Sequence, residues 1–222
     1  MSNDQIQPLK FSERMGYGLG DMASNFFFQT FNIFLLYYYT DVFGISAAAV
    51  GTMFFVTKLW DAVNDPLMGA LSDRTQTRYG KFRPYLLWMA IPYGAMGYIM
   101  FAGPDLDDAG KLIYAWVTYS LMMMLYTAIN VPYSALMGVM TPDSKERTIL
   151  SSFRFVGAFG GGLLISLLVR PMVQYFGVED ETQGFQITMA IFAVVSIVLF
   201  WTTFATTKER VISPPEKNVS LK

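Results

Sequence analysis

Six apolar stretches, each about as long as a membrane-crossing helix, constrain this chain more than any other feature of its sequence. A helix needs about 20 mostly apolar residues to cross the hydrocarbon core of a bilayer. The stretches are bounded by charged or turn-rich segments and cover residues 17–39, 47–71, 85–102, 112–140, 149–169 and 185–206. Pro132 lies inside the fourth, where a proline kinks a buried helix without ending it. The sequence therefore predicts an all-α integral membrane protein with six transmembrane helices.

The composition agrees with a membrane location and excludes several classes of function. Charged residues make up 15% of the chain, whereas about a quarter is usual for a soluble domain. Cys and His are both absent, which excludes disulfides, Cys or His metal sites, cysteine nucleophiles and histidine catalysis. A net charge of −1 gives no reason to expect a nucleic-acid partner. The partner that this composition favours is the lipid bilayer.

The distribution of Lys and Arg predicts how the spans are oriented. One side of the membrane, which includes both ends of the chain, receives twelve of these residues, and the other side receives only Lys111 and Arg170. Positively charged loops stay in the cytoplasm. We therefore expect a cytoplasmic N-terminus over residues 1–14, a transmembrane bundle over 15–206 and the start of a cytoplasmic loop over 207–222. The N-terminus lacks the apolar core of a signal peptide.

Two clusters of residues have structural explanations that need no ligand. Tyr37, Tyr38 and Tyr39 lie where the first span reaches the outer face, and an interfacial aromatic belt is expected there. The glycines of the fifth span resemble a phosphate-binding loop in composition, but no strand precedes them. Gly157 and Gly161 are four residues apart, a spacing that suits close packing of two helices. We expect the tyrosines at the interface and the glycines in a helix contact.

The second span carries ionisable side chains in the part of a membrane helix where they are most costly. Lys58, Asp61 and Asp65 share one helical face, and Asn64 flanks it. Each ionised group at mid-bilayer costs roughly 2.5–3.5 kcal/mol. One base does not balance two acids, so the extra carboxylate favours a mobile cation, either a proton or a hard ion that prefers oxygen ligands. We predict a cation site at Asp61 and Asp65, with Lys58 as their charge partner.

Polar side chains in three other spans could line a hydrogen-bonding cavity. They are Asp21, Asn25, Gln29 and Asn32 in the first span, Tyr126, Thr127, Asn130 and Ser134 in the fourth, and Arg154 in the fifth. A single amide or hydroxyl could equally make an interhelical hydrogen bond worth about 0.6–2 kcal/mol. That explanation fits Arg154 less well, because a guanidinium has many donors and no acceptor. If these faces close on one cavity, it suits a polyhydroxylated solute, with aromatic rings stacked on sugar faces.

The loop between the second and third spans combines basic residues with glycines. It reads GALSDRTQTRYGKFRP over residues 69–84, and Asp73 directly precedes Arg74. Topology alone would explain a basic inner loop. The arrangement also suits ion pairs with a neighbouring helix end that break and re-form as the protein switches state. The residues expected in this gating latch are Asp73, Arg74, Arg78, Lys81 and Arg83.

These motifs resemble those of the glycoside–pentoside–hexuronide:cation symporters, the melibiose-permease group of the major facilitator superfamily. The motifs that carry the resemblance are GLGDMASN (18–25), YYTDV (38–42), LWDAVNDPL (59–67), the loop over 73–84, NVPY (130–133) and KER (145–147). They are spread over the first five spans at similar spacing, so the resemblance covers essentially the whole chain. The patterns of the second span and the inner loop are the specific ones.

The resemblance implies a fold and an activity. The family has twelve helices in two six-helix bundles, each made of two three-helix repeats. It rocks about a central site and couples entry of Na⁺, Li⁺ or H⁺ to sugar uptake. The chain would then be the N-terminal bundle, in the plasma membrane of a bacterium (the inner membrane), and would need a C-terminal bundle for transport. The resemblance implies no enzymatic activity and no cofactor besides the coupling cation.

The resemblance also assigns roles to individual residues. The cation ligands of the family correspond here to Asp61, Asn64, Asp65 and Thr127, with Na⁺ as the metal expected at Asp61 and Asp65. The sugar-binding residues expected here are Asp21, Asn25, Tyr126, Asn130 and Arg154. Asn25 and Asn130 stand where melibiose permease has two acidic sugar ligands, so melibiose itself is not the expected solute. Asp21, one turn from Asn25, is expected to take over a hydroxyl-binding role.

Two alternatives come from other classes of protein. An intramembrane aspartyl protease shares the GxGD pattern of residues 18–21, but that class has the motif late in the chain, followed by Pro-Ala-Leu, and needs a second aspartate on a neighbouring helix. Here the motif opens the first span, and such a short motif outside its context is weak evidence. The second alternative is a non-transporting membrane scaffold or remnant, which would fold without affinity for sugar or cation.

Overall fold

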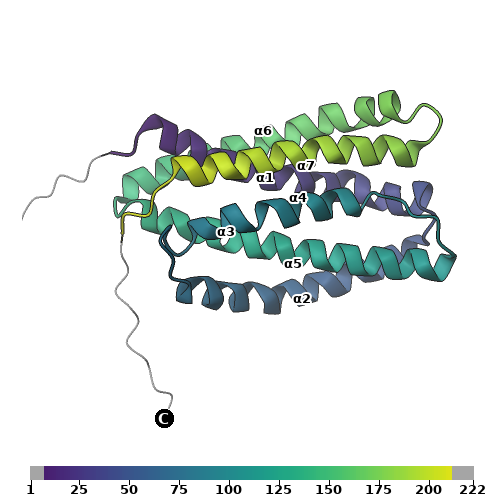
Figure 1. Cartoon of the computed structure of the whole chain (residues 1–222), viewed down its shortest axis with the longest axis horizontal. Helices are drawn as coiled ribbons and strands as arrows, with labels where there is room; N and C mark the ends of the chain where they lie inside the picture. Colours follow the sequence, from purple (N-terminus) through teal and green to yellow (C-terminus); the bar gives the residue numbers. More distant parts are fainter. Residues whose placement is uncertain (1–7, 212–222) are drawn as a thin grey trace, which may run out of the picture.

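The computed structural model describes residues 8–211, and within that range it contains helices and no strand. The elements are α1 (Phe11–Thr30), η1 (Phe31–Leu35), η2 (Tyr38–Val42), α2 (Ala47–Arg74), α3 (Arg83–Trp88), α4 (Ala90–Ile99), α5 (Asp108–Met140), α6 (Ser144–Phe176) and α7 (Glu181–Thr206). They lie side by side along one long axis (Figure 1). Residues 1–7 and 212–222, in the expected N-terminus and cytoplasmic loop, lie outside the described residues.

Each apolar stretch of the sequence has helical structure, and two of the stretches are divided. The first contains α1 followed by the π-helical turns η1 and η2. The third contains α3 and α4, which meet at Met89. This break follows from Pro92, which has no N–H to donate to the carbonyl of Trp88 one turn earlier. Pro132, by contrast, lies inside the continuous helix α5, as expected.

Among the described residues, three helices are long and apolar enough to cross a membrane by length and composition alone: α5, α6 and α7. The other three stretches differ from these for reasons visible in their sequences. In the third stretch, α3 and α4 are short. In the first, α1 is long enough but carries Glu13, Arg14 and Asp21, and α2 carries Lys58, Asp61 and Asp65 among its apolar residues.

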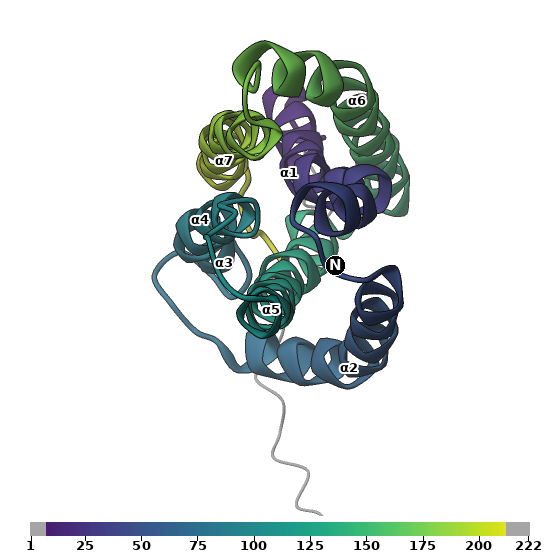
Figure 2. The same ribbon diagram turned by 90° about the vertical axis from the view of Figure 1, so that its right-hand side faces the viewer.

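Two glycines of α6 bring its backbone against that of α1. A Cβ atom on Gly157 would lie far inside van der Waals contact with the carbonyl oxygen of Gly18, and one on Gly161 would lie 3.1 Å from that of Met22. Such close approach is the usual reason for small residues in a contact between membrane helices. The packing role predicted for these glycines is confirmed. Around this contact, α1 packs along α6 and α7, α4 packs on α7, and α2 packs on α5 (Figure 2).

The aromatic belt predicted for three tyrosines is wrong for two of them. Tyr38 and Tyr39 are fully buried, and the Tyr38 ring lies 4.7 Å from that of Phe101. Only Tyr37 is half-exposed, and its hydroxyl donates to Glu181 at 3.0 Å. Successive side chains of a helix point in directions about 100° apart, so three in a row cannot all face the membrane interface.

Ion pairs tie the beginning of α1 to two other parts of the chain. Glu13 accepts a hydrogen bond from Arg210, beyond the end of α7, at 2.6 Å. Arg14 pairs with Glu146 in the first turn of α6 at 2.8 Å. Burial would raise the pKa of Glu13, but hydrogen bonds from Arg210 and from the main-chain N–H of Lys10 outweigh it and hold that pKa below its ordinary value.

A pH titration should detect the Glu13–Arg210 pair. A carboxyl group whose pKa is lower in the folded state stabilises that state above its unfolded pKa, and loses this contribution as the pH falls through the folded value. The melting temperature of the wild type should therefore exceed that of Glu13→Gln at neutral pH. The two melting temperatures should converge only at pH values below the ordinary pKa of a glutamate side chain. A difference that is constant with pH would contradict this assignment.

The loop after α2 is attached to the end of α7 through one carboxylate. Glu209 accepts hydrogen bonds from the main-chain N–H groups of Lys81, Phe82 and Arg83 at 2.9, 2.8 and 3.0 Å. Gly80, with a φ of 109°, adopts a conformation that side chains disfavour, and a Cβ there would collide with the Glu209 carboxylate. The loop and the tail thus form one unit.

Removing this carboxylate should loosen the loop. Glu209→Ala leaves three main-chain donors without their acceptor, and we expect it to lower the free energy of unfolding by about 1–3 kcal/mol. Lys208→Ala, a change at the exposed neighbouring residue, is the matched control and should have little effect. Thermal unfolding of both variants in detergent measures the difference. Equal stability of the two variants would show that the contact contributes nothing.

Candidate functional site

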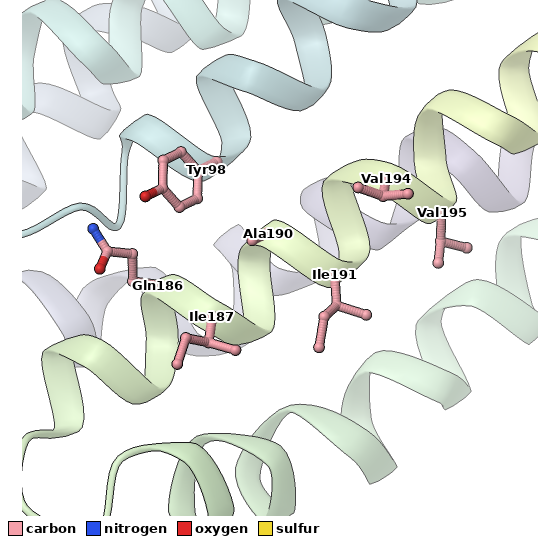
Figure 3. A pocket seen from close by; sticks show the side chains of 7 residues that line it. All are labelled: Tyr98, Gln186, Ile187, Ala190, Ile191, Val194 and Val195. Carbon is pink, nitrogen blue, oxygen red and sulfur yellow. The ribbon is translucent and has the colours of Figure 1, made fainter.

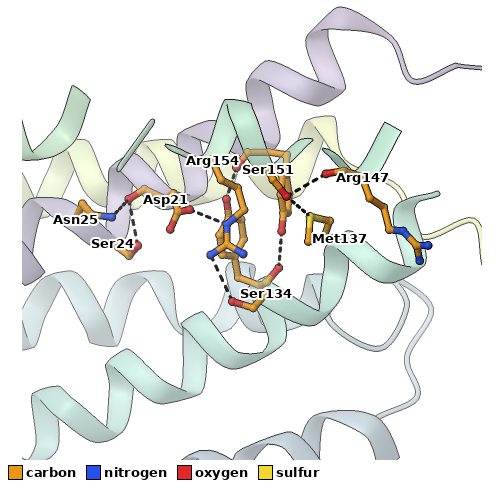
Figure 4. A network of polar contacts seen from close by, with 10 residues as sticks. Asp21, Ser24, Asn25, Ser134, Met137, Arg147, Ser151 and Arg154 are labelled. Carbon is orange, nitrogen blue, oxygen red and sulfur yellow. Dashed lines mark hydrogen bonds and ion pairs between the residues drawn. The ribbon is translucent and has the colours of Figure 1, made fainter. Parts of the chain in front are cut away.

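A short charged contact inside the bundle joins α1 to α6. Arg154 Nε donates to Asp21 Oδ2 at 2.7 Å (Figure 4). Each residue lies one helical turn from the glycine contact, Asp21 after Gly18 and Arg154 before Gly157. The same close crossing that requires glycine therefore places the two charges opposite each other. Both residues were predicted for the sugar site, but nothing in the sequence indicated that they pair.

Two tyrosines form a rigid wall beside this pair. The rings of Tyr17 and Tyr133 stack with centroids 4.7 Å apart, and each hydroxyl donates to the carbonyl of the other residue, at 3.2 and 2.5 Å. The guanidinium carbon of Arg154 lies 5.0 Å from the Tyr133 centroid. A cation at this distance from an aromatic ring is attracted to it. Arg154 is thus held by a carboxylate and an aromatic face together.

The remaining predicted sugar ligands lie on α1 and α5. Asn25 Nδ2 donates to the carbonyl of Asp21 at 2.8 Å, and Asn130 Nδ2 donates to that of Tyr126 at 3.1 Å. Both amides are therefore held along their own helices. The Tyr126 ring stacks on Phe28 with centroids 5.3 Å apart, which connects α5 to α1. All three side chains are partly exposed, as a ligand-binding surface requires.

The predicted cation ligands connect α5 to the charged face of α2. Thr127 Oγ1 donates to Asp65 Oδ1 at 2.8 Å. Lys58 Nζ lies 3.8 Å from Asp61 Oδ2. The other carboxylate oxygen, Asp61 Oδ1, is buried and has no hydrogen-bond partner within the described part of the chain. Asn64 is half-buried on the same helix.

This donor set fits a proton or a small hard cation. Two carboxylates and a hydroxyl provide the oxygen ligands that such ions prefer, and the unpartnered Asp61 oxygen is a free acceptor inside the bundle. Residues 8–211 contain no group of three or more Asp, Glu, Cys or His residues that could hold a metal.

The residues predicted for the gating latch separate into two groups. Arg83 donates through Nη2 to the Phe204 carbonyl at 2.6 Å, and with Lys81 it donates main-chain N–H groups to Glu209. Arg78 stacks on its neighbour Tyr79, whereas Asp73 and Arg74 are exposed at the end of α2 and pair with no charged residue in the range 8–211.

Glu209 was not among the residues predicted from the sequence. In the sequence, Glu209 is distinguished only as the single acidic residue between Lys208 and Arg210, in the basic segment that follows α7. A single acid flanked by bases commonly pairs with one of them, so its contact with main-chain donors in a distant loop was not predictable from this pattern.

An apolar pocket of about 480 Å³ lies apart from these residues, on α4 and α7 (Figure 3). Its lining residues are Tyr98, Gln186, Ile187, Ala190, Ile191, Val194 and Val195. None of the predicted site residues lines it. A mostly aliphatic lining offers few hydrogen bonds to hydroxyl groups and does not suit a sugar.

The contact of Asp21 also bears on the protease alternative. An aspartyl protease needs two carboxyl groups facing each other, whereas the described partner of the Asp21 carboxylate is the Arg154 guanidinium.

Comparison with known proteins identifies the family. The family model described as "MFS/sugar transport protein" matches residues 16–222. The chain is 49% identical to the putative glycoside/cation symporter YagG of Escherichia coli, over 91% of this chain and 44% of that protein. It is 46% identical to the inner membrane symporter YicJ of the same organism, over 93% of this chain and 45% of that protein.

A third relative comes from another genus. The isoprimeverose transporter of Lactiplantibacillus pentosus is 41% identical over 90% of this chain and 42% of that protein. The chain thus spans less than half the length of these curated relatives. Its apolar helices and these relatives make it a multi-pass protein of the bacterial inner membrane. The chain belongs to the MFS/sugar transport protein family.

Proposed function

We propose that this chain is the N-terminal half of a symporter that couples uptake of a glycoside, pentoside or hexuronide to entry of Na⁺, Li⁺ or H⁺. The observation that carries the proposal is the hydrogen bond from Thr127 to Asp65, which joins α5 to the ionisable face of α2. Relatives named as a glycoside/cation symporter and an isoprimeverose transporter support the pairing of sugar with cation. No enzymatic step is part of the proposal.

The proposed topology has six transmembrane spans and both termini in the cytoplasm. Each of the six apolar stretches is helical, which supports the count. The Glu13–Arg210 pair brings the beginning of α1 and the segment after α7 to the same end of the bundle. That end also carries most of the Lys and Arg residues, and positively charged loops remain inside.

A second six-helix bundle is part of the proposed transporter. The matched relatives are more than twice as long as the aligned part of this chain. Alternating access in such folds is a rocking of one bundle against another around a central site. Transport is therefore expected only when this chain acts together with a C-terminal bundle, and Asp73, Arg74, Arg78, Lys81 and Arg83 are the residues proposed to gate it from the cytoplasm.

The proposed cation site consists of Asp61, Asn64, Asp65 and Thr127. The unpartnered oxygen of Asp61 and the hydrogen bond from Thr127 to Asp65 support it. Lys58 lies beside Asp61 as a tethered positive charge, which offsets part of the repulsion between the two acids before the cation enters. Ionisable side chains within a membrane-spanning helix cost free energy to insert, and those that occur there commonly bind or carry ions.

The proposed sugar site consists of Asn25, Tyr126, Asn130 and Arg154, with Asp21 at its edge. Ring stacking of Tyr126 on Phe28 and the contact of Arg154 with Tyr133 place aromatic surfaces beside hydrogen-bonding groups. Amides and a guanidinium can bind sugar hydroxyls, and a guanidinium can also bind the carboxylate of a sugar acid in a bidentate manner.

Ligand-dependent stabilisation tests this function. The complete transporter, with this chain joined to its second bundle, should be melted in detergent against a panel of glycosides, pentosides and hexuronides, with and without Na⁺. A bound ligand at a hundredfold excess over its Kd stabilises a protein by about 2.7 kcal/mol. At least one sugar should raise the melting temperature, and more so with the coupling cation. Stabilisation by no sugar under any cation condition would favour the non-transporting scaffold.

A further inference from the structure

The Arg154 side chain divides its hydrogen-bond donors between the protein and the space beside it. Its Nε donates to Asp21 Oδ2 at 2.7 Å, whereas its terminal nitrogen Nη2 lies 3.5 Å from Ser134 Oγ, at the outer limit of a hydrogen bond (Figure 4). A guanidinium has more N–H donors than one carboxylate accepts. The contact through Nε therefore leaves the two terminal nitrogens available to another acceptor.

We propose that Asp21 is a positioning residue: its carboxylate holds Arg154 by Nε and presents the terminal nitrogens of the guanidinium to the sugar. The proposal rests on the proposed function of the chain. It differs from the expectation of the sequence analysis in that Asp21 does not itself bind sugar hydroxyls. It assigns a distinct task to each member of the pair, with Arg154 touching the solute and Asp21 acting through Arg154.

Exposure distinguishes the two members of the pair. The Asp21 side chain is 12% exposed and the Arg154 side chain is 25% exposed. The main-chain carbonyl of Asp21 is also occupied, since Ser24 and Asn25 donate to it. A solute that approaches from the partly exposed side of the pair meets the guanidinium before the carboxylate.

The surroundings of Asp21 are stiff, as a positioning role requires. Gly18 and Gly157 hold the two helices in backbone contact within one turn of the pair. The reciprocally bonded rings of Tyr17 and Tyr133 fill the space beside the guanidinium. With its Nε held and one face against Tyr133, the guanidinium plane has little freedom to rotate.

This arrangement lowers the cost of binding. A free arginine side chain loses rotamer freedom when it binds a ligand, and a side chain already held in its bound orientation loses less. The planar fork of a guanidinium gains most from such preorganisation, because both terminal nitrogens must face the acceptor together. The Asp21–Arg154 pair is also neutral overall, which reduces the cost of placing Arg154 at this depth.

A double-mutant cycle on sugar affinity tests the proposal. In the complete transporter, the Kd of the best sugar from the panel should be measured for wild type, Asp21→Asn, Arg154→Gln and the double variant. Asp21→Asn should weaken binding by about tenfold or more, because a misplaced binding group loses most of its effect. In the Arg154→Gln background, the same change should alter the Kd less than about twofold. Ser151→Ala, on α6 one turn before Arg154, is the control and should bind as wild type does.

Two outcomes of the cycle would overturn the proposal. If Asp21→Asn weakens binding by the same factor in both backgrounds, Asp21 contacts the sugar itself. If Asp21→Asn lowers the melting temperature but leaves the Kd unchanged, its role is only structural. The Kd is therefore read from fractions confirmed as folded by size-exclusion chromatography.

A second measurement needs no sugar and keeps the two proposals separable. Modification of Arg154 by phenylglyoxal, followed by mass spectrometry, reports how tightly the guanidinium is held. Asp21→Asn should speed this reaction severalfold, while Ser151→Ala should not, and an unchanged rate in Asp21→Asn would overturn the positioning role. If no sugar binds the wild type while Asp21→Asn still speeds modification, the proposed function fails and the held guanidinium stands.

Discussion

Replacement of Gly157 by leucine is expected to abolish the folded bundle. The Cβ atom alone would overlap the carbonyl oxygen of Gly18, and main-chain atoms on both sides leave no flexible group that could move away. The remaining leucine atoms would push α6 off α1, and with it the Asp21–Arg154 pair. The variant should be missing from the monodisperse peak in fluorescence-detected size-exclusion chromatography. Overpacking usually costs about 1–3 kcal/mol, and more where backbone opposes backbone.

A matched pair of alanine variants isolates this effect from helix propensity. Ala is a better helix former than Gly by about 1 kcal/mol, and both variants receive that gain. A Cβ on Gly160 would meet only the flexible end of Met22, at 3.3 Å. Gly160→Ala should therefore melt at or above the wild-type temperature, and Gly157→Ala well below it. Similar melting temperatures for the two variants would mean that α1 and α6 do not pack through Gly157.

Asp65→Asn is expected to abolish cation-driven accumulation of sugar by the complete transporter while leaving sugar exchange intact. The amide introduced in place of the Asp65 carboxylate would still accept the hydrogen bond from Thr127, but it could neither carry a proton nor offset the charge of a bound cation. Uptake against a gradient should fall to the level of empty proteoliposomes. Exchange of labelled for unlabelled sugar, which needs no net cation entry, should continue.

The control for this prediction is an exposed aspartate. Asp105 lies exposed in the loop between α4 and α5, and accumulation by the Asp105→Asn variant should equal that of the wild type. If Asp65→Asn still concentrates sugar against its gradient, Asp65 does not bind the coupling cation. If exchange is lost as well, the variant must be checked for folding before its transport is interpreted.

Local patterns of the sequence predicted the helices and the glycine contact. Apolar length and turn-rich boundaries specify where a chain becomes helical in a membrane, because every main-chain group must be paired there. The spacing of Gly157 and Gly161 predicted close packing because it depends only on which residues share a helical face.

The sequence did not predict contacts between side chains that lie far apart along the chain. Asp21 pairs with Arg154 across 133 positions, and Glu209 reaches Lys81 across 128. Both depend on how two helices cross, which follows from the packing of the whole bundle. The tyrosine belt failed for a local reason, since Tyr38 and Tyr39 turn inward among aromatic rings.

Part of the predicted site is brought together in the structure. The meeting of Thr127 with Asp65 joins two residues that the resemblance assigned to one cation site from different spans. The roles of these residues in binding stay predictions, as do those of Asn64 and of Asp73 and Arg74, which are exposed at the end of α2. Their contacts with a second bundle would lie outside this chain.

Mutual dependence of sugar and cation affinity tests the central claim most directly. The sugar Kd of the complete transporter should be measured with and without Na⁺ or Li⁺ and across pH, and the cation Kd with and without sugar. Because coupling between two binding sites is reciprocal, each ligand should tighten the other by the same factor. Asp65→Asn should remove that factor. A sugar Kd that is independent of Na⁺, Li⁺ and pH would contradict a coupled cation site in this half.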